Sequence, residues 1–392
     1  MRYLIEFKNM MRINIREYGM FIALFLIVVF FTMFTPNNVF FSPRNISNLI
    51  NQNGYIAVLA VGMTLVIVIR HIDLSVGSVA GFLGAVVTIM MVEQNIPMQL
   101  AIPAVLVFGA IIGMFNGLLI AKVGMPAFVV TLAGMMAFRG GLFQITQRTG
   151  TILIGIDEFN AIGNGFIPDF AVLDDFHFLT LVVGAIGIIL VIFFQFKERS
   201  AKQRYKFDVP SLPIFVSKLL FIAMAIGYLS MVLSQHNGLS WTVVIVLLVV
   251  IVYHFITSKT VLGRHIYAVG SNPEASKLTG ISVSKITVFV FGSMGMLAAL
   301  SGILFTARLQ AATINAGEFF ELDAIAGAFV GGVSSAGGVG KVTGSIIGAL
   351  VMASLTNGMQ LMGRGTSEQH IVRGIVLLIA VAFDVISRRK SR

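Results

Sequence analysis

The sequence predicts an all-α polytopic membrane protein, and two observations carry that prediction. Of 392 residues, 57% are hydrophobic and only 11% are charged, whereas a soluble domain carries about 25% charged residues. The apolar residues also form long uncharged runs, such as Leu74–Val92 and Met98–Ala121. A crossing takes about 20 such residues, and helices satisfy their own backbone hydrogen bonds in lipid. The runs lack the alternation of membrane β-strands.

Taken in order, the apolar runs predict about 12 transmembrane helices. The first is expected to be a retained helix, because no small-residue cleavage site follows it. The tenth is short enough to be a half-helix held inside the protein. The predicted spans lie at about 18–35, 54–69, 74–92, 98–121, 125–146, 178–196, 213–234, 239–257, 286–307, 322–334, 342–362 and 371–386.

Lysine and arginine set the orientation, because cytoplasmic loops are enriched in both. They gather in the tails, at Arg2, Lys8, Arg12, Arg16, Arg388, Arg389, Lys390 and Arg392, and in the loops Lys197–Lys206 and Lys259–Lys285. Twelve crossings place all of them on one side, so both termini are expected in the cytoplasm. The long loop at 147–177 falls outside, with the acidic residues Asp157, Glu158, Asp169, Asp174 and Asp175. It is either a surface cover or a docking surface for an external protein.

Several function classes are disfavoured by the residues themselves. The net charge of +10 sits at the ends of apolar runs and not on one face, which argues against nucleic acid. The chain has no cysteine, and no histidine cluster has metal-ligand spacing. The segment Gly337–Lys341 fails as a phosphate-binding loop, because Ser335 and Val342 stand where glycine and serine or threonine are required. No cofactor is expected, and any ATP would be hydrolysed by another chain.

Two stretches share a spacing that predicts an internal repeat. Asp73 is followed by glycine at four and eight residues, as is Asp323, and each stretch is followed by an Asn-Gly pair, at Asn116 and Asn357. The two copies would run in opposite directions through the membrane, as in transporters whose pathway lies between inverted repeats. Asp73, Ser75, Asn116, Asp323 and Asn357 are therefore candidates for the pathway. Capping and packing roles stay open for the aspartates, and interhelical hydrogen bonding for the asparagines.

The segment 272–281 predicts a short helix on the cytoplasmic side. Asn272 is a capping residue, Pro273 suits the first helical position, Glu274 suits the first turn, and Gly280 is a stop signal. Ala275 and Leu278 would then be exposed. Such a helix either inserts into a groove on a partner or lies flat on the bundle or the lipid.

Four separated motifs resemble the permease subunit of bacterial monosaccharide ABC importers, the ribose, galactose, arabinose and xylose systems. The likeness runs from about residue 45 to the C-terminus. The motifs are Ile72–Ser78, Phe128–Gly134, Gly270–Ile281, and Glu321–Ala326 with Gly337–Gly340.

The resemblance implies a fold and a set of partners. The fold is the type II importer fold with ten helices in a single domain over 1–392, to which an inserted hairpin at about 178–236 adds two. Repeat 1 would cover about 54–146 and repeat 2 about 286–386, with the coupling loop at 258–285. The implied partners are a second permease copy, an ATPase with two nucleotide domains that seats on Asn272–Ile281, and an external sugar-binding protein.

The inserted hairpin is similar to that of the longer xylose-type permeases, which favours xylose or a related pentose as cargo. The resemblance also implies the bacterial cytoplasmic membrane as the location, and a transport subunit that is not an enzyme. The alternative function is a secondary, ion-coupled carrier of sugar or another small solute. A carrier of that kind needs coupling acids within the membrane, and none stands out in the sequence.

Overall fold

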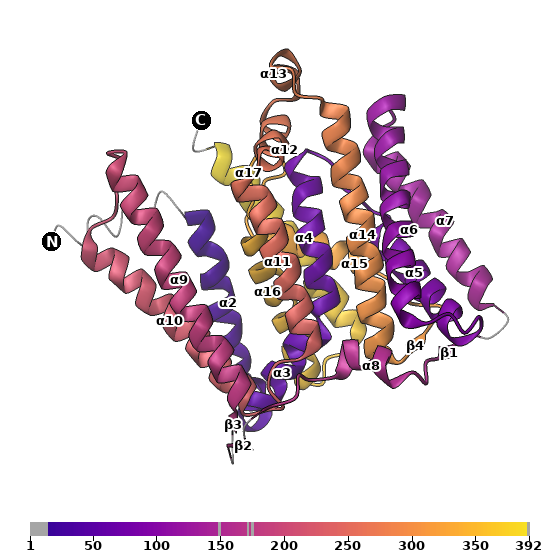
Figure 1. Cartoon of the computed structure of the whole chain (residues 1–392), viewed down its shortest axis with the longest axis horizontal. Coiled ribbons are helices and arrows are strands. Elements are labelled where there is room, and N and C mark those ends of the chain that lie inside the picture. The colour runs from indigo at the N-terminus through magenta and orange to yellow at the C-terminus, as the bar shows by residue number, and fades with distance from the viewer. Residues whose placement is uncertain (1–14, 148–149, 171, 174–175, 390–392) are drawn as a thin grey trace.

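The computed structural model describes residues 15–147, 150–170, 172–173 and 176–389, and they form a helical bundle (Figure 1). The first half contains α2 (Ile15–Phe34), η1 (Pro36–Phe41), α3 (Pro43–Gln52), α4 (Gly54–Val68), α5 (Val76–Val92), α6 (Met98–Leu118), η2 (Leu119–Val123), α7 (Ala127–Thr146), β1 (Ile152–Leu153), α8 (Asp157–Asn164), β2 (Val172–Leu173) and β3 (Phe176–His177). The second half contains α9 (Phe178–Arg204), α10 (Leu212–Ser234), α11 (Trp241–Lys259), α12 (Val261–Ser271), α13 (Pro273–Leu278), α14 (Val283–Leu309), β4 (Ala311–Ala312), α15 (Phe320–Val330), α16 (Val342–Leu361) and α17 (Thr366–Arg389).

The predicted fold class is confirmed, and a helix lies at each of the 12 predicted spans. Eight helices of the described chain are long and apolar enough to cross a membrane alone, and a ninth span results if the bent pair α3–α4 counts as one. The tenth predicted span is α15, whose 11 residues extend only about 16 Å. Since most of α15 is buried, it matches the predicted half-helix inside the protein.

One end of the bundle collects the loops that the charge pattern assigns to the cytoplasm. The Arg70 guanidinium donates to the Gly270 carbonyl at 2.6 Å, and the Gly338 N–H donates to the Val68 carbonyl at 2.8 Å. The Ser284 hydroxyl donates to the Ala121 carbonyl of η2 at 3.1 Å, and α13 projects from this end of the bundle (Figure 1). Seven charged residues used in the orientation argument lie outside the described residues: Arg2, Lys8, Arg12, Asp174, Asp175, Lys390 and Arg392.

The opposite end contains the long loop at 147–177, whose described residues include regular elements that its sequence does not predict. It forms β1, which pairs with β4, and the short helix α8. The acidic residues Asp157 and Glu158 occupy the first turn of α8, where the helix dipole favours negative charge. The Asn164 side chain donates to the Ala307 carbonyl at 2.8 Å, which fixes α8 against the end of α14.

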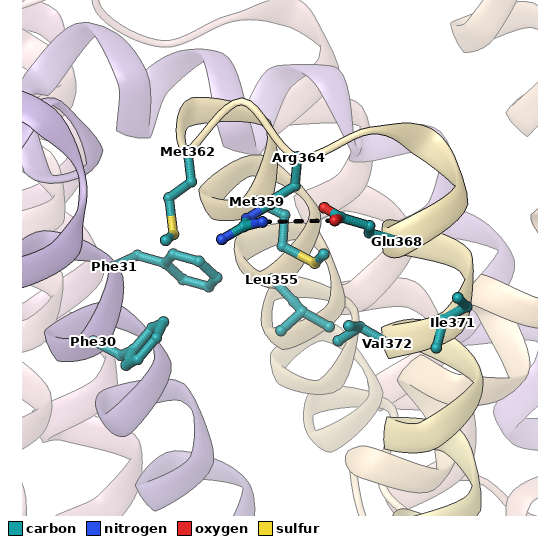
Figure 2. A pocket seen from close by; sticks show the side chains of 9 residues that line it. All are labelled: Phe30, Phe31, Leu355, Met359, Met362, Arg364, Glu368, Ile371 and Val372. Atoms are coloured by element: carbon teal, nitrogen blue, oxygen red, sulfur yellow. Dashed lines mark ion pairs between the residues drawn. The ribbon is translucent and has the colours of Figure 1, made fainter.

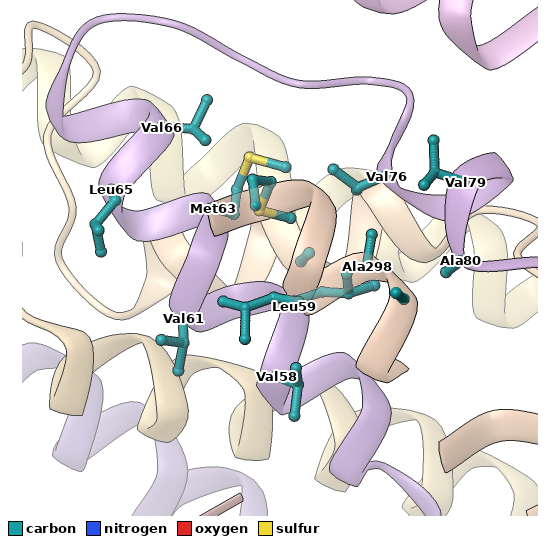
Figure 3. Packing of buried hydrophobic residues seen from close by; sticks show 14 of the residues in the cluster. Val58, Leu59, Val61, Met63, Leu65, Val66, Val76, Val79, Ala80 and Ala298 are labelled. Carbon is teal, nitrogen blue, oxygen red and sulfur yellow. The ribbon is translucent and has the colours of Figure 1, made fainter. Parts of the chain in front are cut away.

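The core forms around α4, which is buried on nearly all sides (Figure 3). Beside it, α14 packs on α6 with the two backbones in contact. A Cβ atom added to Gly295 would lie 2.8 Å from the Gly113 backbone nitrogen, and one added to Gly109 would overlap the Gly295 carbonyl. Helices in lipid associate through such van der Waals contact, so these glycines hold α6 and α14 together.

Helices α9 and α10 form the predicted hairpin at the edge of the bundle (Figure 1). The basic stretch Lys197–Lys206, expected to be a loop, is mostly helical, because α9 continues to Arg204. Lysine, arginine, glutamate and glutamine favour helix, and cations suit a helix C-terminus. Glu198 and Lys202 also form an ion pair of 2.8 Å one turn apart. The prediction of a loop there was wrong for these reasons.

The glycines of the two predicted repeat copies pack differently. Gly327 of α15 and Gly331, which follows that helix, face Gly348 and Gly344 of α16, backbone against backbone. On α5, the corresponding glycines, Gly77 and Gly81, face the non-helical segment at 316–317. The inverted repeat therefore stays a prediction, and the copies share a glycine spacing and not a common partner.

Candidate functional site

The short helix α13 has the local structure that its sequence predicts. The side-chain oxygen Oδ1 of Asn272 accepts from the Ala275 N–H at 3.1 Å, which caps the helix. Pro273 occupies the first turn, and Gly280 follows the last turn with a φ of +84°, a left-handed conformation that glycine adopts without strain. Glu274 forms an ion pair of 3.4 Å with a lysine one turn on.

One face of α13 is not covered by the rest of the described chain. Leu278 is 90% exposed, and Ala275 is exposed beside it. Ser276 is buried and Ile281 packs on the main core, so the helix is attached through its opposite face. The apolar side chain of Leu278 therefore extends away from a helix whose opposite face is attached to the bundle.

The candidate residues of the first repeat copy form a buried cluster where α5 begins. The Asp73 carboxylate accepts from the Ser75 N–H at 2.9 Å and from its hydroxyl at 2.6 Å, and the Asn116 amide donates to the same hydroxyl at 3.5 Å. All three side chains are buried. Asp73 thus turns the chain into α5, and Asn116 ties α6 to that turn.

The candidate residues of the second copy meet at the opposite end of the bundle. Asp323, in the first turn of α15, forms an ion pair of 3.0 Å with Arg373 of α17, whose guanidinium also donates to Thr356 of α16 at 3.1 Å. Asn357 exchanges two amide hydrogen bonds with Asn45 of α3, at 2.9 and 3.1 Å. Asp323 therefore joins two helices instead of capping its own, and Asn357 holds α16 to α3.

A polar pocket of about 240 Å³ opens beside these contacts, between α4, α15, α16 and α17. It includes both Asp323 and Asn357. Its other lining residues are Gln52, Asn53, Tyr55, Ile56, Glu318, Phe320, Ala349, Met352, Ala353, Thr356, Gln360 and Arg373. Sequence reasoning missed its glutamines and Tyr55, because isolated polar residues near helix ends are ordinary at a membrane interface.

A second pocket, of about 460 Å³, has a different character (Figure 2). Phe30 and Phe31 of α2 face Leu355 and Met359 of α16 across it, and its charged residues, Arg364 and Glu368, pair with each other at 3.6 Å. Such a lining offers few hydrogen bonds to a polar solute, so the 240 Å³ pocket is the better candidate for polar cargo.

Known proteins resemble this chain over almost its whole length. It is 37% identical to the xylose transport system permease protein XylH of Escherichia coli strain K12 over 385 residues, 98% of this chain and 95% of that protein. It is 38% identical to XylH of Haemophilus influenzae over 379 residues, covering 96% and 98%. The ribose import permease protein RbsC of Escherichia coli strain K12 is 33% identical over 364 residues, covering 93% and 92%.

No solved structure matches the chain. The family described as the permease component of the branched-chain amino acid transport system matches residues 45–381. That range includes α13, both clusters of candidate residues and the polar pocket. The chain therefore belongs to this family of transport-system permease components, and it is a multi-pass transport subunit, not an enzyme.

Proposed function

We propose that this chain is the membrane permease of an ATP-driven importer for a monosaccharide, xylose or a related pentose. The observation that carries the proposal is α13, a rigidly capped helix with Leu278 90% exposed at one end of a membrane bundle. A helix of this kind suits a groove on a second protein. The xylose and ribose permeases among its relatives support the choice of cargo.

The α13 end is the cytoplasmic end in this proposal, with both termini in the cytoplasm of a bacterial inner membrane. Lys122, Arg264, Lys277 and Lys285 lie in the segments that gather there, as the positive-inside rule requires. ATP would be bound and hydrolysed by a separate subunit with two nucleotide domains, which seats on Asn272–Ile281. The permease itself needs no cofactor in this scheme.

The proposed cycle uses two copies of the permease. A loaded sugar-binding protein docks on the external end, at the loop that contains α8, and ATP closes the cytoplasmic ATPase. The motion reaches each bundle through α13, because its buried face is fixed to the core by Ile281. A pentose is neutral, so its path needs hydrogen-bonding groups and no counter-charge.

The test is uptake of labelled xylose by vesicles that contain this chain, its ATPase and its binding protein. The double variant Glu274→Arg and Leu278→Arg should abolish uptake, because two guanidinium groups cannot be desolvated in an apolar groove. The variant should keep the unfolding temperature of the unmodified protein, since both side chains are exposed.

The matched control is Tyr205→Arg, which places the same side chain at a position 75% exposed beyond α9. Uptake should be unchanged in that control. Full uptake in the α13 double variant would refute coupling through α13. Accumulation of xylose by this chain alone under a proton gradient would refute ATP-driven import and identify an ion-coupled carrier.

A further inference from the structure

The polar pocket contains hydrogen-bonding groups that the fold itself does not use. Gln52, Tyr55 and Gln360 line it, and their side chains make no hydrogen bond within the described part of the chain. The Asn53 amide donates to the Leu49 carbonyl, which leaves its own oxygen as a further acceptor. Gln52, Asn53 and Tyr55 are partly buried and Gln360 is exposed, and polar groups that leave water cost free energy unless they find a partner. The pocket is therefore built for a polar occupant, water or solute.

An aromatic surface lies beside these groups. Tyr55 packs on Phe320 with ring centroids 4.6 Å apart, and both rings contact Phe305, at 5.2 and 5.0 Å. The Tyr55 ring is thus fixed by its neighbours while its hydroxyl stays unpaired. An apolar ring face next to several amides suits a ligand that has C–H groups on one face and hydroxyls around its edge, which is the chemistry of a sugar ring.

The charges of the pocket favour a neutral ligand. The Asp323 carboxylate and the Arg373 guanidinium satisfy each other at 3.0 Å, and Glu318 pairs with Arg139 at 3.3 Å. A zwitterion such as an amino acid would have to separate a paired carboxylate and guanidinium to form its own ion pairs. In a partly buried site, the free energy lost by breaking the existing pair exceeds the free energy gained from the new contacts. A polyol can donate to the carboxylate and accept from the guanidinium while the pair stays intact.

The pocket is small. Its volume of about 240 Å³ is enough for several water molecules or for one pentose or hexose ring.

We propose that the pocket between α4, α15, α16 and α17 is a binding site for a single neutral monosaccharide within each permease protomer. This inference rests on the proposed function and adds a site to it. The hydroxyl of Tyr55 and the amides of Gln52 and Gln360 hydrogen-bond the sugar, its ring lies against the Tyr55–Phe320 surface, and Asn357 keeps α16 in place. The permease itself then contributes to selectivity.

The test measures binding of D-xylose to the full-length permease alone in lipid nanodiscs, by saturation-transfer NMR, without ATPase or binding protein. Xylose should bind saturably, and leucine should not compete. Tyr55→Phe and Gln52→Leu should each weaken binding about three- to tenfold, the loss expected for one hydrogen bond. Tyr228→Phe is the matched control, since that ring stacks on Phe41 at the hairpin, outside the pocket. The affinity of this variant for xylose should equal that of the wild type.

The outcomes separate this site from the proposed function. No saturable binding, equal binding by the wild-type, Tyr55→Phe and Gln52→Leu proteins, or competition by leucine would overturn the sugar site. Uptake by the complete system would still stand in each of those cases. If the complete wild-type system takes up no xylose, the proposed function is refuted, whatever the permease binds alone.

Discussion

The contact between α15 and α16 makes a sharp prediction for Gly348→Ala. The added Cβ would overlap the Gly327 carbonyl oxygen and lie 2.6 Å from the Gly331 backbone nitrogen. Both are backbone atoms, so no side chain can rotate away, and the helices must separate. Overpacking of this kind costs about 1–3 kcal/mol, and replacing glycine by alanine in a helix returns about 0.5–1 kcal/mol. The net expectation is a loss of about 1 kcal/mol in the free energy of unfolding, within a range of about 0–2.5 kcal/mol.

Gly374→Ala on α17 is the matched control, because a Cβ at that position meets nothing within 4 Å. It should be neutral or stabilising by up to about 1 kcal/mol. Both variants are compared with the wild type by equilibrium unfolding in mixed micelles of mild detergent and SDS. The explanation by backbone contact fails if Gly348→Ala resists denaturant as well as Gly374→Ala does.

Three further predictions concern single polar contacts. Asp323→Asn leaves the Arg373 guanidinium without its carboxylate and should lower the free energy of unfolding by about 1–3 kcal/mol, less than for a fully buried pair; Arg373→Met in the same chain should recover part of the loss. Asn272→Ala removes the cap of α13, worth about 1 kcal/mol, so hydrogen exchange there should accelerate while global unfolding is unchanged. Asn45→Leu and Asn357→Leu should each destabilise by about 0.6–1.7 kcal/mol, and the double variant by less than their sum.

Much of the fold could be predicted because membrane thickness imposes a length on each helix. The run Leu74–Val92 is apolar for the length of a crossing, and α5 covers Val76–Val92. The errors occur where that constraint ends. Beyond the hydrocarbon region, Lys197–Arg204 is polar enough to be read as a loop, yet its residue types favour helix and α9 continues through it.

The two candidate sites differ in how far apart their residues lie in the sequence. Helix α13 is specified by neighbouring residues, from the cap at Asn272 to the stop at Gly280, so its sequence suffices. The polar pocket is not local: Tyr55 and Arg373 are more than 300 residues apart in the chain and meet only when α4 and α17 pack beside α15. A single sequence gives no information on which distant residues come into contact in the fold.

The backbone contact between α6 and α14 fixes the distance between these two helices, which can serve as an internal reference in experiments. With Gly109 and Gly113 seated on Gly295 and its neighbours, neither helix can shift along the other without collision. Spin labels attached to these two helices should therefore report one distance in every state of the transport cycle. The natural chain contains no cysteine, so labelling sites can be introduced singly, and any distance that does change locates the moving parts elsewhere.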